Sequence, residues 1–147
     1  MEKQPVQVII RGHQQDISEE IIEQRCRGYY SYRNGTHFIS YEECYENGKK
    51  AGTEGFSLLK IKNNTVHILK KGAITTRMEF DTHKNHYTPY QTPYGVFQME
   101  ISTDSLTIRR EGEDFLIHIS YELHMEGQLL SKCSIEIQVR FEGKPSP

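Results

Sequence analysis

Turn-forming residues recur along the chain about once per strand length, and this spacing constrains the fold more than any other feature. Asn34-Gly35 is the clearest case, because Asn-Gly supplies the positive φ angles of a type I′ hairpin turn. Similar signals occur at Asn47-Gly48, Asn63-Asn64, Lys71-Gly72, Thr103-Asp104, Glu111-Gly112 and Glu126-Gly127. Between them, apolar and polar residues alternate as in half-buried strands. The sequence therefore predicts an antiparallel meander.

An open sheet of this many strands would leave unpaired edges, so the meander must close into a barrel or split into two packed sheets. We predict an all-β fold, a single antiparallel up-and-down β-barrel of eight to ten strands formed by residues 1–147, with a frayed tail at 143–147. The predicted strands are 5–12, 21–33, 36–46, 55–62, 65–70, 73–80, 93–102, 105–110, 114–125 and 129–141. The predicted loops are 14–19, 47–53 and 81–92, and residues 16–20 can form one helical turn.

Charge and cysteine content narrow the functional classes. The formal net charge is −2 with both signs interleaved along the chain, so we expect no nucleic-acid partner. The longest apolar run near the start is Val8-Ile9-Ile10, too short for a leader or a membrane span, so we expect a cytoplasmic protein and no membrane contact. Cys26, Cys44 and Cys133 show no C-x-x-C spacing, which predicts three reduced thiols in core or half-buried positions.

Strand periodicity assigns side chains to the barrel interior. On 114–125 the inward set is Phe115, Ile117, Ile119, Tyr121, Leu123 and Met125. The same alternation on 21–33, 36–46, 65–70 and 105–110 places charged and tyrosine side chains inward, which suggests a polar pocket. The candidate ligand-binding residues are Tyr30, Tyr32, Tyr41, Glu43, Lys70, Arg110 and Tyr121.

Two alternatives to this pocket stay open. The charges lie near strand ends, where Lys and Arg side chains reach water, so their inward position need not indicate a ligand. In addition, Phe38 makes the opposite face of 36–46 a credible interior, and in that register Glu42 replaces Glu43.

Histidines and nucleophiles give no catalytic or metal signature. His83 and His86 are three residues apart in a predicted loop, and His118 and His124 share the outer face of one strand, so neither pair supplies three converging ligands. No G-x-S-x-G elbow accompanies the serines. We expect no metal, no cofactor and no catalytic residue.

Several strings carry a resemblance that spans nearly the whole chain. They are Tyr41-Glu42-Glu43, Lys71-Gly72-Ala73, Met78 with Phe80, Thr92-Pro93-Tyr94-Gly95 and Ile119-Ser120-Tyr121. Together they resemble the YwiB-like family of bacterial proteins, a domain of unknown function. The resemblance implies a calycin- or lipocalin-like β-barrel in the cytoplasm without an assigned reaction. One departure is Lys70, where such sequences tend to have Arg, so an anion bound there would meet a point charge instead of a bidentate group.

Three functions follow as hypotheses. The first is a barrel that binds a small polar or anionic molecule in its interior. The second is an interaction or structural module with a filled barrel, for which a homodimer is one arrangement. The third, more distant, is an enzyme that uses Glu43 or Glu42 as a general base. An unfilled cavity of a few hundred Å³ would favour the first hypothesis.

Overall fold

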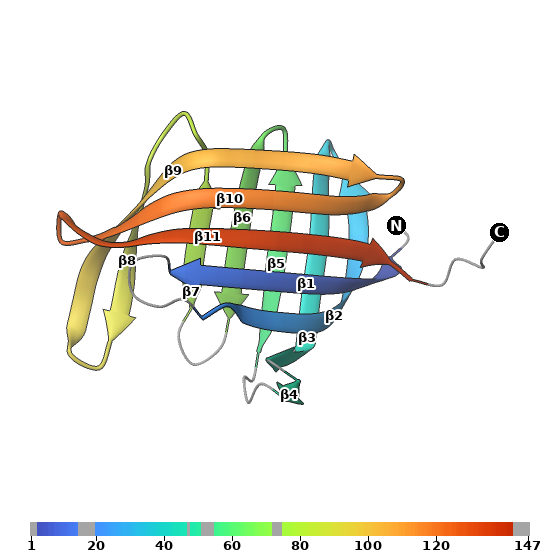
Figure 1. The fold of residues 1–147 in the computed structure, drawn as a ribbon, viewed down its shortest axis with the longest axis horizontal. Helices are drawn as coiled ribbons and strands as arrows, with labels where there is room; N and C mark the ends of the chain where they lie inside the picture. Colours follow the sequence, from blue (N-terminus) through green and yellow to red (C-terminus); the bar gives the residue numbers. More distant parts are fainter. Residues whose placement is uncertain (1–2, 15–19, 47, 51–54, 72–74, 143–147) are drawn as a thin grey trace.

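The computed structural model describes residues 3–14, 20–46, 48–50, 55–71 and 75–142, which form eleven β-strands (Figure 1). The strands are β1 (Gln4–Gln14), β2 (Ile22–Arg33), β3 (Thr36–Glu46), β4 (Lys49–Lys50), β5 (Phe56–Lys62), β6 (Thr65–Lys71), β7 (Thr76–Phe80), β8 (His86–Thr92), β9 (Gly95–Glu111), β10 (Asp114–Met125) and β11 (Gln128–Phe141). These segments contain no helix long and apolar enough to cross a membrane. The all-β prediction is confirmed.

The strands form one antiparallel sheet that curls into a nearly closed up-and-down barrel. The order is β7-β6-β5-β3-β2-β1-β11-β10-β9-β8, with β4 paired to the end of β3. The first and last long strands, β1 and β11, are therefore neighbours, and the seam of the barrel lies between β7 and β8. Figure 1 shows β9, β10, β11 and β1 running across one layer, with β3, β5, β6 and β7 crossing behind them.

Most predicted turns are confirmed by their backbone angles. Asn34 and Gly35 have φ of 52° and 77°, the two positive values that a type I′ turn requires. Glu126 and Gly127 repeat this pair with 51° and 80°, and Asn63 has φ of 53°. Asn47 and Gly72 lie outside the described residues, as do most of the predicted helical turn at 16–20 and the predicted tail.

The turn predicted at Thr103-Asp104 is wrong, because residues 93–102 and 105–110 belong largely to the single strand β9. Ser120 of β10 faces Ser105 and Tyr121 faces Thr103, so Asp104 is an extra residue on β9. This is a β-bulge, which bends a strand without ending it. Figure 1 shows the result: the first half of β9 runs beside β8 at one side of the barrel, and the second half crosses the front.

The loop predicted for residues 81–92 is also partly wrong, since it contains strand β8. Proline has no backbone N–H, so Pro89 would leave one hydrogen bond unmade in a central strand. For this reason proline disfavours a strand only in the middle of a sheet. β8 is at the edge of the sheet, where this loss is tolerated. A smaller correction concerns Lys49–Lys50, which form β4 within the loop predicted for 47–53.

The prediction of three free thiols is wrong as well, since Cys26 and Cys44 form a disulfide across β2 and β3, with their Cα atoms 4.1 Å apart. Arg25 faces Tyr45 and Arg27 faces Glu42, so Cys26 alone lies opposite two residues of β3. Strict alternation along 36–46 would put Cys44 on the face of Phe38, and this bulge breaks that alternation. Cys133 is the free, buried cysteine of the described residues.

The core fills the barrel between the two layers. The largest core side chains that are less than 2% exposed come from both layers: Phe80, Ile39, Leu59, Ile101, Ile117, Ile119, Ile137, Val6, Val8, Val66 and Val139. They follow the alternation of β10 and its neighbours, with Phe115, Ile117, Ile119 and Tyr121 all buried as predicted. The apolar packing does not extend evenly to both ends of the barrel.

Candidate ligand-binding site

A cavity of about 520 Å³ opens at one end of the barrel. It lies where β1 and β6 end and where β2, β7 and β11 begin. Polar and apolar residues line it in about equal number: Ile10, Gly12, His13, Gln14, Glu20, Ile22, Gln24, Tyr41, Ile68, Lys70, Met78, Tyr121, Cys133, Ser134 and Ile135. A cavity of this size is typical of small-molecule sites.

Tyr41 is the most deeply buried polar residue in this lining, with 3% of its surface exposed. Its Oη is buried and has no hydrogen-bond partner among the described residues. Burial raises the pKa of Tyr41 to about 12, so the phenol is neutral at pH 7. The Ser57 hydroxyl acts in the opposite direction and lowers this pKa, but it forms no hydrogen bond of acceptable geometry with Oη.

Gly28 sets the position of Tyr41 from the neighbouring strand. The two residues face each other across β2 and β3. A Cβ at residue 28 would overlap the carbonyl oxygen of Ser40 and lie 3.0 Å from Cβ of Tyr41. Glycine therefore allows the close approach of β3 that holds Tyr41 inward.

Tyr121 lies on the opposite layer and also lines the cavity. It is 7% exposed, and its ring packs edge-on against Phe80 with the ring centres 4.9 Å apart. Burial raises the pKa of Tyr121, so this phenol is also neutral at pH 7. Cys133 faces Tyr121 from β11, and its thiol donates to Oγ of Ser131 at 3.5 Å.

The three predicted interior charges do not form one buried network. Lys70 lines the cavity but is exposed at its rim, and Arg110 is exposed at the end of β9. The side chain of Glu43 lies outside the described residues. Glu42 is exposed while its neighbour Tyr41 is buried, so the alternative register with Glu42 inside is wrong.

The remaining predicted residues, Tyr30, Tyr32 and Arg110, belong to an aromatic cluster away from the cavity. Tyr30 Oη and His37 Nδ1 share a hydrogen bond of 2.7 Å, and the Arg110 guanidinium lies 4.0 Å from the ring centre of Phe115. Tyr32 packs beside His37, with the ring centres 4.9 Å apart. Burial raises the pKa of Tyr30, and burial together with Arg110 lowers the pKa of His37.

The cavity thus contains Tyr41, Tyr121 and Lys70 of the predicted set, joined by residues that the prediction left out. Gln24 and Ile22, at the start of β2, are two of these. Strand alternation places both inward, so their sequence pattern contained a usable signal. The sequence around Gly12 and His13, at the end of β1, does not indicate that they line a site. They lie at the cavity because β1 pairs with β11, which the sequence does not show.

A metal site has no support in the described segments, where no three His, Cys, Asp or Glu side chains converge. His83 lies in an exposed turn, where its amide donates to Oδ1 of Asp81 at 2.9 Å. His86 instead faces Glu79, with Nδ1 and Oε2 3.3 Å apart.

Fold and cavity together define a small antiparallel β-barrel with a pocket open at one end. The chain belongs to the family described as Domain of unknown function (DUF1934), whose model matches residues 8–137. It is 26% identical over 110 residues to the uncharacterized beta-barrel protein YwiB of Bacillus subtilis (strain 168), covering 75% of this chain and 74% of that protein. The resemblance inferred from the sequence is confirmed.

A solved structure shows the same fold. The crystal structure of the ywiB protein from Bacillus subtilis superposes with a TM-score of 0.76 at 21% identity, covering 96% of this chain and 94% of that one. At this identity the likeness concerns the fold alone.

Proposed function

We propose that this chain is a calycin-like barrel that binds one small polar or anionic molecule in the cavity at the end of β1 and β6. The proposal rests on Tyr41, whose hydroxyl is buried without a partner beside about 520 Å³ of open space. An unsatisfied buried hydroxyl costs about 1–3 kcal/mol, and a ligand group that bonds to it would remove this cost.

The lining indicates the chemistry of the ligand. Tyr41 and Tyr121 are neutral and offer hydrogen bonds in the depth of the cavity, whereas Lys70 offers a positive charge at the rim. Ile10, Ile68 and the other apolar side chains surround the space between them. This arrangement fits a molecule with an apolar body, an oxygen acceptor at its inner end and an acidic group near the opening.

Ligand screening with matched variants tests the proposal. Small carboxylates and phosphates are screened by thermal shift, and hits are confirmed by native mass spectrometry with wild type, Tyr41→Phe and Lys70→Met. We expect a bound compound to lose about tenfold in affinity in each variant, since one hydrogen bond or charge contact is missing. Lys132→Met, on an exposed position of β11, is the control and should bind as wild type. Equal affinity in all four proteins would place the ligand elsewhere and contradict the proposal.

An interaction module is the second candidate, favoured by exposed apolar residues on two adjacent hairpin tips. Tyr94 is 92% and Val96 62% exposed near the β8–β9 turn, and Leu129 and Leu130 lie after the β10–β11 turn. A hydrogen bond of 2.9 Å from the Glu126 amide to the Gln98 carbonyl joins the two tips. A homodimer through these tips would appear in sedimentation velocity and would be lost in Val96→Asp.

We propose that the protein lies in the cytoplasm. The Cys26–Cys44 disulfide then has to be compatible with a reducing compartment. A cytosolic disulfide is usually transient, so the bond would form reversibly there. Acid quenching of cells followed by alkylation of free thiols tests this. A mixed population of reduced and oxidised Cys26 and Cys44 fits the cytoplasm, whereas complete oxidation would favour an oxidising compartment.

A further inference from the structure

The outer surface of the layer formed by β2, β3, β5, β6 and β7 gathers positive charge that is dispersed along the sequence. Leu59, Ile61, Val66 and Ile68 are buried inside the barrel, so the residues that alternate with them point outward. We call the resulting cation set the basic face: Arg33 of β2, Lys60 and Lys62 of β5, Lys71 of β6 and Arg77 of β7.

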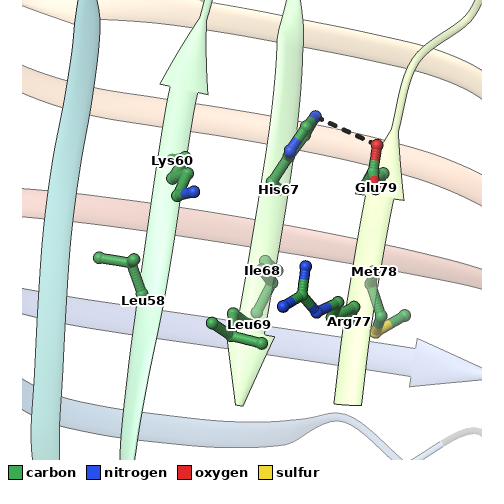
Figure 2. A pocket seen from close by; sticks show the side chains of 8 residues that line it. All are labelled: Leu58, Lys60, His67, Ile68, Leu69, Arg77, Met78 and Glu79. Atoms are coloured by element: carbon green, nitrogen blue, oxygen red, sulfur yellow. Dashed lines mark ion pairs between the residues drawn. The ribbon is translucent and has the colours of Figure 1, made fainter. Parts of the chain in front are cut away.

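None of these five cations forms an ion pair with a carboxylate of the described residues. Glu79, an acidic residue on the same surface, already lies 3.5 Å from Nε2 of His67 (Figure 2). It also lies 3.3 Å from Nδ1 of His86. By contrast, Arg11 on β1 pairs with Glu23 at the start of β2 at 2.7 Å and with Glu136 on β11 at 3.7 Å. The five cations of the basic face are thus unpaired within the described residues, although the chain as a whole has a net charge of −2.

Aromatic rings lie among these cations. The Arg33 guanidinium is 5.4 Å and the Lys60 ammonium 5.9 Å from the ring centre of Phe38 on β3. Lys71 lies 5.6 Å from the ring centre of Phe56, which is 42% exposed. Tyr29 on β2 is 54% exposed on the same surface. Rings on a sheet surface with adjacent cations are the combination that proteins use to stack bases and pair phosphates of single strands.

Beside Lys60 and Arg77 the surface has a small hollow of about 50 Å³. Figure 2 shows Leu58 and Leu69 together at this hollow, with Lys60, His67 and Arg77 nearby. Pairing places Phe38 beside Lys60 and Lys60 beside His67 across neighbouring strands. Four strand spacings of ~4.8 Å separate β2 from β7, so the surface is about 19 Å wide, enough for a short stretch of extended strand.

We propose that the basic face binds single-stranded nucleic acid, with phosphates contacting Lys60 and Arg77 and bases stacking on Phe38 and Phe56. This activity is separate from the cavity, which opens inside the barrel. The sequence led to the opposite expectation, because the same cations are interleaved with acids along the chain. Only strand pairing brings them together. An acidic protein or an anionic membrane would use the cations but would have no need for rings beside them.

Fluorescence anisotropy tests the proposal with labelled 12-nucleotide single-stranded DNA and RNA, the matching duplex, and heparin, between 50 and 200 mM salt. We expect the single strands to bind more tightly than the duplex. The Lys60→Ala/Arg77→Ala double variant should lose at least tenfold in affinity at low salt. The slope of log K against log salt concentration should become less negative by about 1.4, since each lost phosphate contact contributes about 0.7 to the slope on a single strand.

Two further variants keep the test specific. Phe38→Leu retains the cations and should weaken single-strand binding about fivefold or more, while leaving heparin binding unchanged. Arg109→Ala/Arg140→Ala removes two exposed cations from β9 and β11 and should bind as wild type. The proposal is overturned if wild type binds no single strand at 50 mM salt, if both double variants lose affinity equally, or if heparin or anionic vesicles compete while Phe38→Leu has no effect.

Discussion

At the scale of single residues, the buried hydroxyl of Tyr41 lowers the stability of the fold because it has no hydrogen-bond partner among the described residues. A core built for stability alone would place an aliphatic side chain at this position, because a buried hydroxyl without a partner costs about 1–3 kcal/mol. Here the hydroxyl is kept, and Gly28 gives β3 the room to hold it inward. A buried polar group without a partner calls for an explanation, and a ligand that bonds to Tyr41 is the one we propose.

The ionisation of Tyr41 predicts a loss of stability at alkaline pH. Its pKa in the folded protein is about 12, above the ordinary value of 10.0, so folding favours the protonated phenol. The resulting stabilisation is complete below pH 10 and is lost as the pH rises from 10 to 12, by about 2–3 kcal/mol. Denaturant unfolding at several pH values measures this. Tyr41→Phe should unfold with a shallower alkaline decline than wild type, and parallel curves would show that Tyr41 is accessible to water.

For single residues, the sequence predicted well whether a side chain points into the barrel. It predicted poorly at which height along the barrel that side chain lies. Alternation assigns Tyr30, Tyr41 and Tyr121 to the inside, and all three are buried or half-buried. It does not say at which end of the barrel each lies, because that depends on strand register and tilt. Tyr41 and Tyr121 therefore line the cavity, whereas Tyr30 belongs to the aromatic cluster with His37.

At the scale of elements, the errors in strand prediction share one physical origin. Thr-Asp and Asn-Gly pairs both disturb regular strand pairing. Whether such a pair forms a bulge or a hairpin turn depends on which strands lie beside it in the folded protein. At Asn34-Gly35 the chain reverses, whereas at Asp104 strand β10 continues to pair on both sides. The bulge at Cys26 likewise changed which face Cys44 occupies.

The Cys26–Cys44 disulfide predicts a redox-dependent stability. It closes a loop with a sequence separation of 18 residues, and a loop of this length is worth about 3 kcal/mol in the unfolded chain. Reduction should therefore lower the free energy of unfolding by about this amount. Urea unfolding with and without dithiothreitol measures it, and Cys26→Ala/Cys44→Ala is the control that should not respond to the reductant. An equal response of both proteins would mean that the bond is absent.

At the scale of the whole molecule, the seam between β7 and β8 decides whether the barrel is closed. No ladder pairs these two strands, so other contacts must join the sheet edges. The Asp81 amide, directly after β7, donates to Oγ1 of Thr103 on β9 at 3.2 Å. Glu79 and His86 form the second contact, and the rings of Phe80 and Tyr121 meet across the interior.

Thr103→Val tests whether this seam holds the barrel together. Thr103 is 8% exposed, and valine keeps its shape while removing the acceptor of the Asp81 amide. Leaving that half-buried amide unsatisfied should cost about 1–2 kcal/mol in denaturant unfolding and should speed hydrogen exchange at Asp81 and along β7. Thr107→Val, four residues further along β9 at an exposed position, should change neither measurement. If exchange on β7 stays at the wild-type rate in Thr103→Val, the seam is closed by the Glu79–His86 pair and the ring contact, and the hydrogen bond to Thr103 is dispensable.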